Sequence, residues 1–236
     1  MKVVYTRQGN KLFVKDEQQD FHSKYGTIKK TQLKKNKAKT NTGVEFSIFN
    51  ASFIDKFEKI KRGAQIINLK DIGAVIAFTG INKESVVIDA GSGSGALACA
   101  LANIVKKVYT YDNRQEHIKT VKENIKFFGL KNIEVKKQDV YKGFPKKNAD
   151  LITLDLKEPW LCLEHAYNSL KFGGFLVSYS PNIGQVQEFI NKNKKFLLIK
   201  TIEIIERPWV VKGKVARPDF TPFGHTGFLT FMRKIR

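Results

Sequence analysis

Acidic residues follow several short apolar runs in this sequence, at positions that could serve the binding of a nucleoside. Asp89, Asp112 and Asp155 each stand at the end of such a run, and a further acid, Asp139, comes directly after Gln138. A carboxylate can accept hydrogen bonds from ribose hydroxyls or from the exocyclic amine of a base. If the runs are parallel strands, their carboxyl ends meet at one edge of a sheet, where open α/β folds bind ligands. We therefore expect these acids to belong to one site.

A glycine-rich segment joins the first of these runs to a predicted helix. Glycine there lets the backbone pass close to a ligand and make a turn that a side chain would prevent, and the helix would offer its N-terminal NH groups. Asp112 comes 21 residues after Gly91, where a carboxylate can accept hydrogen bonds from two ribose hydroxyls. The candidate ligand-binding residues of the segment are Gly91, Ser92, Gly93, Ser94 and Gly95. The ligand is therefore expected to carry a nucleoside.

Two nucleoside-bearing cofactors fit this pattern, NAD and S-adenosylmethionine (SAM). The spacing of Gly91, Gly93 and Ala96 matches a loose dinucleotide fingerprint, which alone is a weak signal. Asp89 favours SAM, because its negative charge would repel a pyrophosphate but suits a cationic sulfonium with its amino acid tail. Asp139 is placed to accept a hydrogen bond from an adenine amine. The alternative is that these acids cap the turns that follow them, but their succession at strand ends favours SAM.

The elements that must position these residues alternate from about residue 65. Strands are predicted over 85–91, 107–112, 132–137, 150–156 and 175–180. Helices are predicted over 71–80, 96–105, 114–129, 160–170 and 184–193. This alternation indicates an α/β fold with right-handed crossovers and a doubly wound, parallel sheet. Two strands without a helix between them, 197–211 and 225–234, are expected to close the sheet as an antiparallel pair.

The first sixty residues predict a small basic β domain. Alternating residues on either side of Gly9-Asn10 are typical of a hairpin. Further strands are expected at 25–30 and 45–52, separated by an exposed loop at 34–43, and a linker helix is expected at 53–63. We therefore predict two domains, 1–60 and 61–236.

The charge of the chain favours a polyanionic partner. The 42 basic and 22 acidic residues give a net charge of +20, and residues 1–62 carry 15 basic and 6 acidic side chains, a net of +9. This N-terminal part has more than twice the charge density of the rest, which favours nucleic acid. The alternative is compositional, because 35 of the basic residues are lysine and a lysine-rich proteome would give a basic chain without such a partner.

Composition also excludes several classes of protein. No apolar run approaches the roughly 20 residues that span a bilayer, and the first ten residues lack the apolar block of a signal peptide. The two cysteines, Cys99 and Cys162, exclude a disulfide framework or a cysteine-rich zinc site. Neither they nor the histidines have metal-ligand spacing. We expect a cytoplasmic protein that neither binds a metal nor associates with a membrane.

The segment LDLKEPW (154–160) carries the candidate catalytic residue, Asp155. A carboxylate, a proline-fixed turn and a large aromatic ring occur together at the end of the fourth predicted strand. A base that is to be methylated must be flipped out, stacked and hydrogen-bonded through its Watson–Crick edge. Asp155 and Trp160 could supply the hydrogen bond and the stacking, although Trp160 is equally suited to anchoring the core.

With these motifs the chain resembles the tRNA adenine-N1 methyltransferases that act on the T loop, especially the archaeal type. The resemblance covers residue 20 to the end and rests on FHSKYGTI (21–28), KRGAQII (61–67), DAGSGSG (89–95), LDLKEPW (154–160) and GHTGFLTFMRK (224–234). It implies a Rossmann-like SAM-dependent methyltransferase sheet, mostly parallel with an antiparallel C-terminal strand, behind a small N-terminal β domain that docks tRNA. It also implies S-adenosylhomocysteine as product, adenine 58 as target with adenine 57 left open, and a homotetramer. The chain departs from the family pattern at Lys157, usually proline, and at Asn68-Leu69, usually Tyr-Pro.

The resemblance also implies roles for individual residues. N1 of adenine would attack the methyl group of the sulfonium, and Asp155 would accept a hydrogen bond from the exocyclic amine, stabilising the charge that develops on the ring. Gln65 could hold the cofactor or the base, Ile67 could cover the adenine face, and His117 could reach the ribose edge. The alternatives are a surface glutamine, core packing and a solvated helix histidine. For Asp155 the alternative is a capping or salt-bridged side chain.

Three other functions remain open. One is a SAM-dependent methyltransferase of a small molecule or a protein carboxyl, against which the basic β domain argues. Another is an NAD-dependent dehydrogenase, which would need a proton donor near the nicotinamide that no motif here supplies. The third is a non-catalytic RNA-binding subunit, which is disfavoured because the glycine segment, Asp112 and Asp155 are all present.

Overall fold

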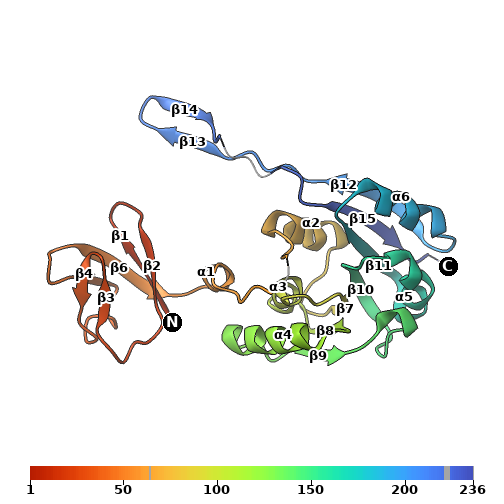
Figure 1. Ribbon diagram of the computed structural model, residues 1–236, viewed down its shortest axis with the longest axis horizontal. Helices are drawn as coiled ribbons and strands as arrows, with labels where there is room; N and C mark the ends of the chain where they lie inside the picture. The colour runs from red at the N-terminus through yellow and green to blue at the C-terminus, as the bar shows by residue number, and fades with distance from the viewer. Residues whose placement is uncertain (64, 221–223, 236) are drawn as a thin grey trace. The chain divides into compact units, whose positions relative to one another are not determined.

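The computed structural model describes residues 1–63, 65–220 and 224–235 (Figure 1). The chain divides into two compact units, Met1–Ile60 and Lys61–Arg236. Within the described ranges no helix is both long and apolar enough to cross a membrane.

The N-terminal unit is built on a four-stranded antiparallel sheet with the order β2-β1-β6-β5. Its strands are β1 (Lys2–Thr6), β2 (Lys11–Val14), β5 (Lys37–Lys39) and β6 (Glu45–Asn50), and a separate two-stranded ladder joins β3 (Phe21–Ser23) to β4 (Gly26–Ile28). The predicted hairpin is present, because Lys2–Tyr5 pairs with Lys11–Val14 around Gly9, whose φ is +87°. One face of the sheet packs into a small core that includes Val4, Phe46 and Ile48.

The sequence prediction was wrong about the segment 34–43, which is not a loop throughout. Its residues Lys37–Lys39 form β5, which pairs with β6, and Ala38 points into the core. Three residues with two exposed lysines give too little apolar alternation to identify a strand. The predicted linker helix is shorter than expected: α1 spans Phe53–Phe57 and begins with a capping box between Ser52 and Asp55.

The C-terminal unit holds a seven-stranded sheet with the order β12-β15-β11-β10-β7-β8-β9. Its strands are β7 (Val86–Ala90), β8 (Lys107–Asp112), β9 (Ile133–Lys137), β10 (Ala149–Leu154), β11 (Leu170–Ser180), β12 (Leu197–Glu203) and β15 (Phe228–Arg233). Four ladders are parallel: β7 with β8, β8 with β9, β7 with β10, and β10 with β11. The strand β15 pairs antiparallel with both β11 and β12. This confirms the doubly wound, mostly parallel α/β fold and the antiparallel closure of its C-terminal edge.

Helices cover both faces of this sheet (Figure 1). One layer contains α2 (Leu69–Thr79), α3 (Ala96–Ala102) and α4 (Gln115–Phe128), and the other contains the 3₁₀ turns η1 (Val140–Lys142) and η2 (Pro159–Cys162) with α5 (Leu163–Ser169) and α6 (Ile183–Lys192). The central strands are apolar because both faces are buried. Gly80 and Gly129 end α2 and α4 in the left-handed conformation, with φ of +65° and +75°.

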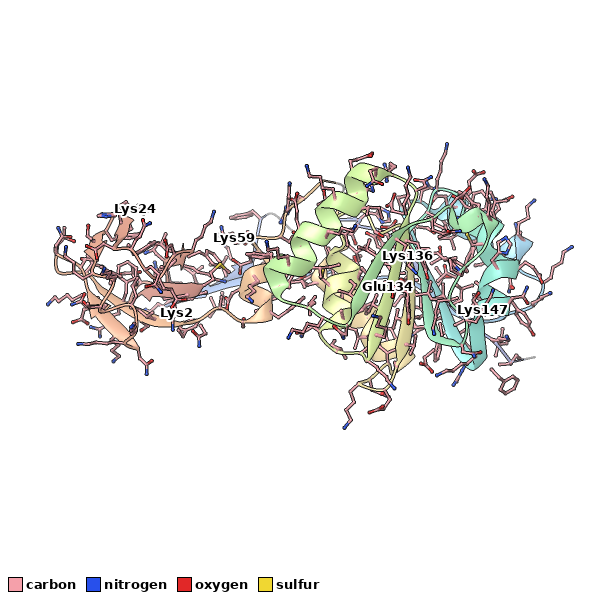
Figure 2. All side chains as sticks on the ribbon, turned by 90° about the horizontal axis from the view of Figure 1, so that it is seen from below. Lys2, Lys24, Lys59, Glu134, Lys136 and Lys147 are labelled. Atoms are coloured by element: carbon pink, nitrogen blue, oxygen red, sulfur yellow. The ribbon has the colours of Figure 1, made fainter. Side chains whose placement is uncertain are left out.

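The edge strands of the sheet are more exposed than the central strands, and a hairpin follows one of them. On β9, Nζ of Lys136 lies 2.6 Å from Oε1 of Glu134 (Figure 2). At the other edge the predicted strand 197–211 begins at Leu197 as expected and pairs antiparallel with β15, but it is shorter than predicted, because β12 ends at Glu203. The following residues form a hairpin of β13 (Trp209–Lys212) and β14 (Val215–Pro218), where Pro208 interrupts the apolar run.

Candidate active site

Two backbone segments meet at the carboxyl end of β7 and β10. The NH of Asp155 donates to the carbonyl oxygen of Ala90 over 2.9 Å, and a Cβ on Gly91 would overlap the Asp155 carbonyl oxygen. Gly91 also has a φ of +91°, so only glycine fits there without displacing Asp155. Gly95 caps α3 with a φ of +79° against Val121. The predicted glycine segment is therefore the turn after β7 that allows the backbone of Gly91 to lie against Asp155, the candidate catalytic residue.

Asp112 is fixed by hydrogen bonds at the end of β8. Its Oδ2 accepts from the Gly93 NH over 3.1 Å, its Oδ1 accepts from the Arg114 NH over 3.0 Å, and His117 Nδ1 lies 2.9 Å from Oδ2. Burial opposes ionisation, but the hydrogen bonds from Arg114, His117 and Gly93 outweigh it and hold the pKa of Asp112 below its usual value. A carboxylate has about four acceptor positions, so about one remains open for a ligand.

His117 is not the solvated helix histidine that was considered from the sequence. Its side chain is buried against Asp112, and it lies outside the lining of the cavities described below. In the described chain its ring contacts and positions the Asp112 carboxylate, so His117 would act on the ribose only through Asp112.

Asp89 lies in the interior, at the base of the site. Its carboxylate accepts hydrogen bonds from Thr110 Oγ1 over 2.6 Å and from Thr153 Oγ1 over 2.8 Å. The Thr110 hydroxyl also lies 2.7 Å from Ser92 Oγ, which ties Asp89 to the glycine segment. Burial raises the pKa of Asp89 to about 6, and the charge of Asp112 adds to this effect. A bound cation would restore the ionised form, because it offsets the cost of burying the charge.

Asp155 has an unusual environment for a carboxylate. Burial raises its pKa to about 7, with further contributions from the charges of Asp89 and Asp112. Within 1–63, 65–220 and 224–235, no hydrogen bond or ion pair reaches its side chain. The capping and salt-bridged alternatives are therefore not realised in the structure. Such a carboxylate is open to a hydrogen-bond donor or a cation from outside the protein.

A cavity of about 470 Å³ lies beside Asp155. Asp112, Gln138, Asp139 and Asp155 all line it, together with the backbone of Gly91. Asp139 also caps the following 3₁₀ turn, because its Oδ1 accepts from the Tyr141 NH over 3.1 Å. Gln138 donates from Nε2 to the carbonyl oxygen of Asp139 over 3.2 Å. The residues predicted to bind the ribose and the adenine thus line one cavity.

A smaller pocket shares Gly91 and Asp155 with this cavity. It is lined by the predicted residues Gln65, Ile67, Asp89, Gly91, Ser92, Gly93, Ser94 and Asp155. Gln65 is exposed and Ile67 is buried. The two pockets together account for all of the predicted residues except Gly95 and His117. In the described part of the chain, no group of three or more histidine, cysteine, aspartate or glutamate side chains could hold a metal ion.

The sequence did not reveal two tyrosines of the site, and it left the role of a tryptophan open. Tyr141 Oη accepts from the Glu158 NH over 3.2 Å, which holds the turn after Asp155. Tyr179 lines a third, small pocket with Asp155 and donates from Oη to the Thr226 carbonyl oxygen over 2.6 Å. Tyr141 follows the end of β9, which was an available signal, whereas Tyr179 lies within β11 and gave none. Trp160 packs against the core and lines a different cavity with Phe196, so the core-anchor alternative is the one realised.

Comparison with known proteins agrees with this geometry. Residues 58–218 match the family model described as tRNA methyltransferase complex GCD14 subunit. The chain is 32% identical to tRNA (adenine(57)-N(1)/adenine(58)-N(1))-methyltransferase TrmI of Methanocaldococcus jannaschii, covering 98% of this chain and 94% of the relative.

Solved structures with the same fold include two methyltransferases. The tRNA (m1A58) methyltransferase TrmI from Aquifex aeolicus has a TM-score of 0.84 and 25% identity, covering 100% of this chain and 96% of its own. A protein described as a SAM-dependent O-methyltransferase from Thermotoga maritima has a TM-score of 0.88 and 27% identity, covering 100% and 92%. Because the family model spans more than half of the sequence and the archaeal relative spans nearly all of it, the chain belongs to the GCD14 family of tRNA methyltransferases.

Proposed function

We propose that the protein transfers a methyl group from SAM to N1 of adenine 58 in the T loop of tRNA, with adenine 57 as a second possible target. The activities named for the Methanocaldococcus jannaschii relative and for the Aquifex aeolicus protein support this reaction. The observation that carries it is the Asp155 carboxylate, which lines both cavities and has no partner among the described residues. A carboxylate in that state can accept a hydrogen bond from the exocyclic amine of a bound adenine.

The residues around Asp155 fit SAM as the cofactor. Asp112 retains an open acceptor for a ribose hydroxyl, and Gln138 and Asp139 line the same cavity, where the adenine would bind. Asp89 and the glycine segment line the smaller pocket, where the cationic end of the cofactor would bind. When bound, SAM supplies an electrophilic methyl group on a positively charged sulfur. Asp89 and Asp155 have no lysine or arginine partner among the described residues, whereas Arg114 Nε lies 3.6 Å from Oδ1 of Asp112. The remaining excess of carboxylates suits that charge and would repel the pyrophosphate of NAD.

Asp155 would lower the barrier through its charge. Methylation at N1 places a positive charge on the adenine ring, which is shared with the exocyclic amine. A hydrogen bond from that amine to Asp155 strengthens as the charge develops, so it stabilises the transition state more than the ground state. The carboxylate needs to be ionised for this role, and the pKa of about 7 in the free protein places that change near neutral pH.

The N-terminal unit would dock the tRNA, and its charge supports this role. Residues 1–60 carry 13 basic and 6 acidic side chains, a net of +7. Such an excess attracts phosphates and gives salt-dependent affinity. The proposed setting is a cytoplasmic one.

A homo-oligomer, with a tetramer as the proposed form, would cover an apolar hairpin of the C-terminal unit. Trp209, Val211 and Val215 of β13–β14 are 58%, 73% and 48% exposed. Exposed apolar side chains in such a group favour association with another protein surface. A second copy of the chain is the partner that this proposal names.

The reaction can be tested with unmodified tRNA transcripts and labelled SAM. We expect label to enter the tRNA and mass spectrometry of the digested product to find N1-methyladenosine. Transcripts in which adenine 58 or adenine 57 is replaced by uridine would assign the target. SAM binding without label transfer to any tRNA would contradict the proposal and favour a small-molecule or protein substrate, as in the O-methyltransferase description of the Thermotoga maritima protein.

A further inference from the structure

A basic cavity lies at the edge of the four-stranded sheet of the N-terminal unit. It has a volume of about 670 Å³ and lies along β5, the outermost strand. Its charged lining consists of the cations Arg7, Lys35, Lys37 and Lys39 and one acid, Glu45. A cavity with three more positive than negative side chains selects an anionic ligand.

The positive charge of this cavity is not neutralised by the protein. In the described part of the chain, none of the four cations forms an ion pair. Four of the six acids of the unit are paired elsewhere, with the N-terminal ammonium, Lys29 or Lys11. These four acids are Glu17, Asp20, Asp55 and Glu58. The cations along β5 therefore remain available to a partner.

The backbone that carries the lysines is held in place by the core. Leu33 and Ala38 are buried, and the NH of Ile48 donates to the Asn36 carbonyl oxygen over 2.8 Å. Lys37 and Lys39 project from the same face of β5, separated by two residues, or about 6.6 Å. Because these side chains start from an ordered strand, binding costs little backbone entropy.

The same face of the sheet carries exposed aromatic surface. Lys37 and Tyr5 both lie opposite Ser47 of β6, so their side chains share the face. Tyr5 stacks on Phe49 with a centroid separation of 5.7 Å, and Phe49 is 45% exposed. Aromatic rings beside unpaired cations are typical of nucleic-acid-binding surfaces, where phosphates and bases are bound together. This combination favours RNA over a small inorganic anion.

We propose that the cavity along β5 binds the sugar–phosphate backbone of the tRNA, with Lys35, Lys37 and Lys39 contacting phosphates. The inference rests on the proposed function, because it takes tRNA as the substrate, and it adds the site in the N-terminal unit that holds the backbone. Its residues are separate from those that line the cavities beside Asp155.

The test compares two full-length triple variants with equal loss of charge. The cavity variant is Lys35→Gln, Lys37→Gln and Lys39→Gln. The control variant is Lys15→Gln, Lys24→Gln and Lys30→Gln, at exposed lysines of the same unit outside the cavity, of which Figure 2 labels Lys24. Binding of an unmodified tRNA transcript is measured by titration over a range of salt concentrations, and single-turnover methylation is measured at saturating SAM.

The plot of log affinity against log salt has a negative slope, to which each phosphate contact contributes about −0.7 to −0.9. We expect this slope to become less steep by about 2–3 units in the cavity variant, which loses three such contacts. At 0.1 M salt, relative to 1 M salt, that corresponds to about 100- to 1,000-fold weaker tRNA binding, whereas the control should change by less than about threefold. The methylation rate at saturating tRNA and the affinity for SAM should stay at the wild-type value in both variants.

The outcomes separate this inference from the proposed function. If wild-type protein binds and methylates tRNA but the cavity and control variants behave alike, the positive charge acts diffusely and the site is refuted. A cavity variant that keeps its affinity but loses its rate also refutes it. If wild-type protein neither binds nor methylates tRNA, the proposed function fails and the inference falls with it.

Discussion

Replacing Asp155 with asparagine should make the protein slower and more stable at the same time. The amide has nearly the same shape and can still accept a hydrogen bond, but it carries no charge. If the carboxylate stabilises charge that develops on adenine, losing it should lower kcat by about 10²–10³, the usual cost of removing one such electrostatic contact. Affinity for tRNA should change little, because Asp155 is proposed to act mainly in the transition state.

The stability change follows from the pKa. Burial raises the pKa of Asp155 from 3.8 to about 7. Between pH 3.8 and about pH 7, the folded protein therefore keeps a proton on Asp155 that the unfolded chain has already released. That contribution to stability is complete below about pH 4 and is lost as the pH rises through about 7. Three units of pKa correspond to about 4 kcal/mol, and partial exposure of the side chain reduces this to about 2–4 kcal/mol. The free energy of unfolding of the variant should therefore exceed that of wild type by this amount at pH 8 and equal it near pH 4.

The assay combines single-turnover methylation at saturating SAM with urea unfolding of the free protein at pH 4, 6 and 8. Glu188→Gln, which removes one charge from the surface of α6, serves as the matched control. It should keep the wild-type rate and stay within about 0.5 kcal/mol of wild type. A near-wild-type rate for Asp155→Asn would refute the role of charge. A loss of stability at pH 8 would refute the account of an unpartnered buried carboxylate.

Three further predictions concern the cofactor and the tRNA. Asp112→Asn should raise the Kd for SAM about 10–150-fold in calorimetry, because one charge-assisted hydrogen bond is worth about 1.5–3 kcal/mol; unchanged affinity would place the ribose elsewhere. The kcat/KM for SAM should rise about tenfold per pH unit below about pH 7 and level off above it, since Asp155 must ionise; a flat profile from pH 5.5 to 8 would contradict that requirement. Inorganic polyphosphate should inhibit in competition with tRNA and not with SAM, because its phosphates match the cations along β5 and are repelled by Asp89, Asp112 and Asp155; competition with SAM in steady-state kinetics would indicate a pyrophosphate site.

The sequence predicted the fold of the C-terminal unit because local patterns there agree with the tertiary structure. Gly80 and Gly129 stop α2 and α4 where the apolar periodicity stops, and the strands between them are buried on both faces. The position of the site followed from this topology, since the carboxyl ends of β7, β8 and β10 bring Asp89, Asp112 and Asp155 to one edge. The placement of these residues needed no side-chain information.

Side-chain environments were the part that the sequence could not supply. His117 could not be identified as the partner of Asp112 because helix position gives the face of a residue but not which group it contacts. Trp160 was equally compatible with base stacking and with the core, and only packing decided between them. β5 was missed because its one buried residue, Ala38, is flanked by lysines, so its strand character depends on pairing with β6.

The distribution of charge suggests why one basic chain can carry an acidic site. Asp155 has no neutralising partner in the described chain, and its neighbours Asp89 and Asp112 raise its pKa further. A phosphate that entered there would face carboxylates in a region of low dielectric constant, whereas a flipped adenine enters neutral and becomes cationic on methylation. The proposed site for the phosphates is the set of unpaired cations along β5. In the proposed function, the acidic site and the basic cavity would discriminate between two parts of the same tRNA, because the cavity would retain the backbone and the carboxylates would admit only a base.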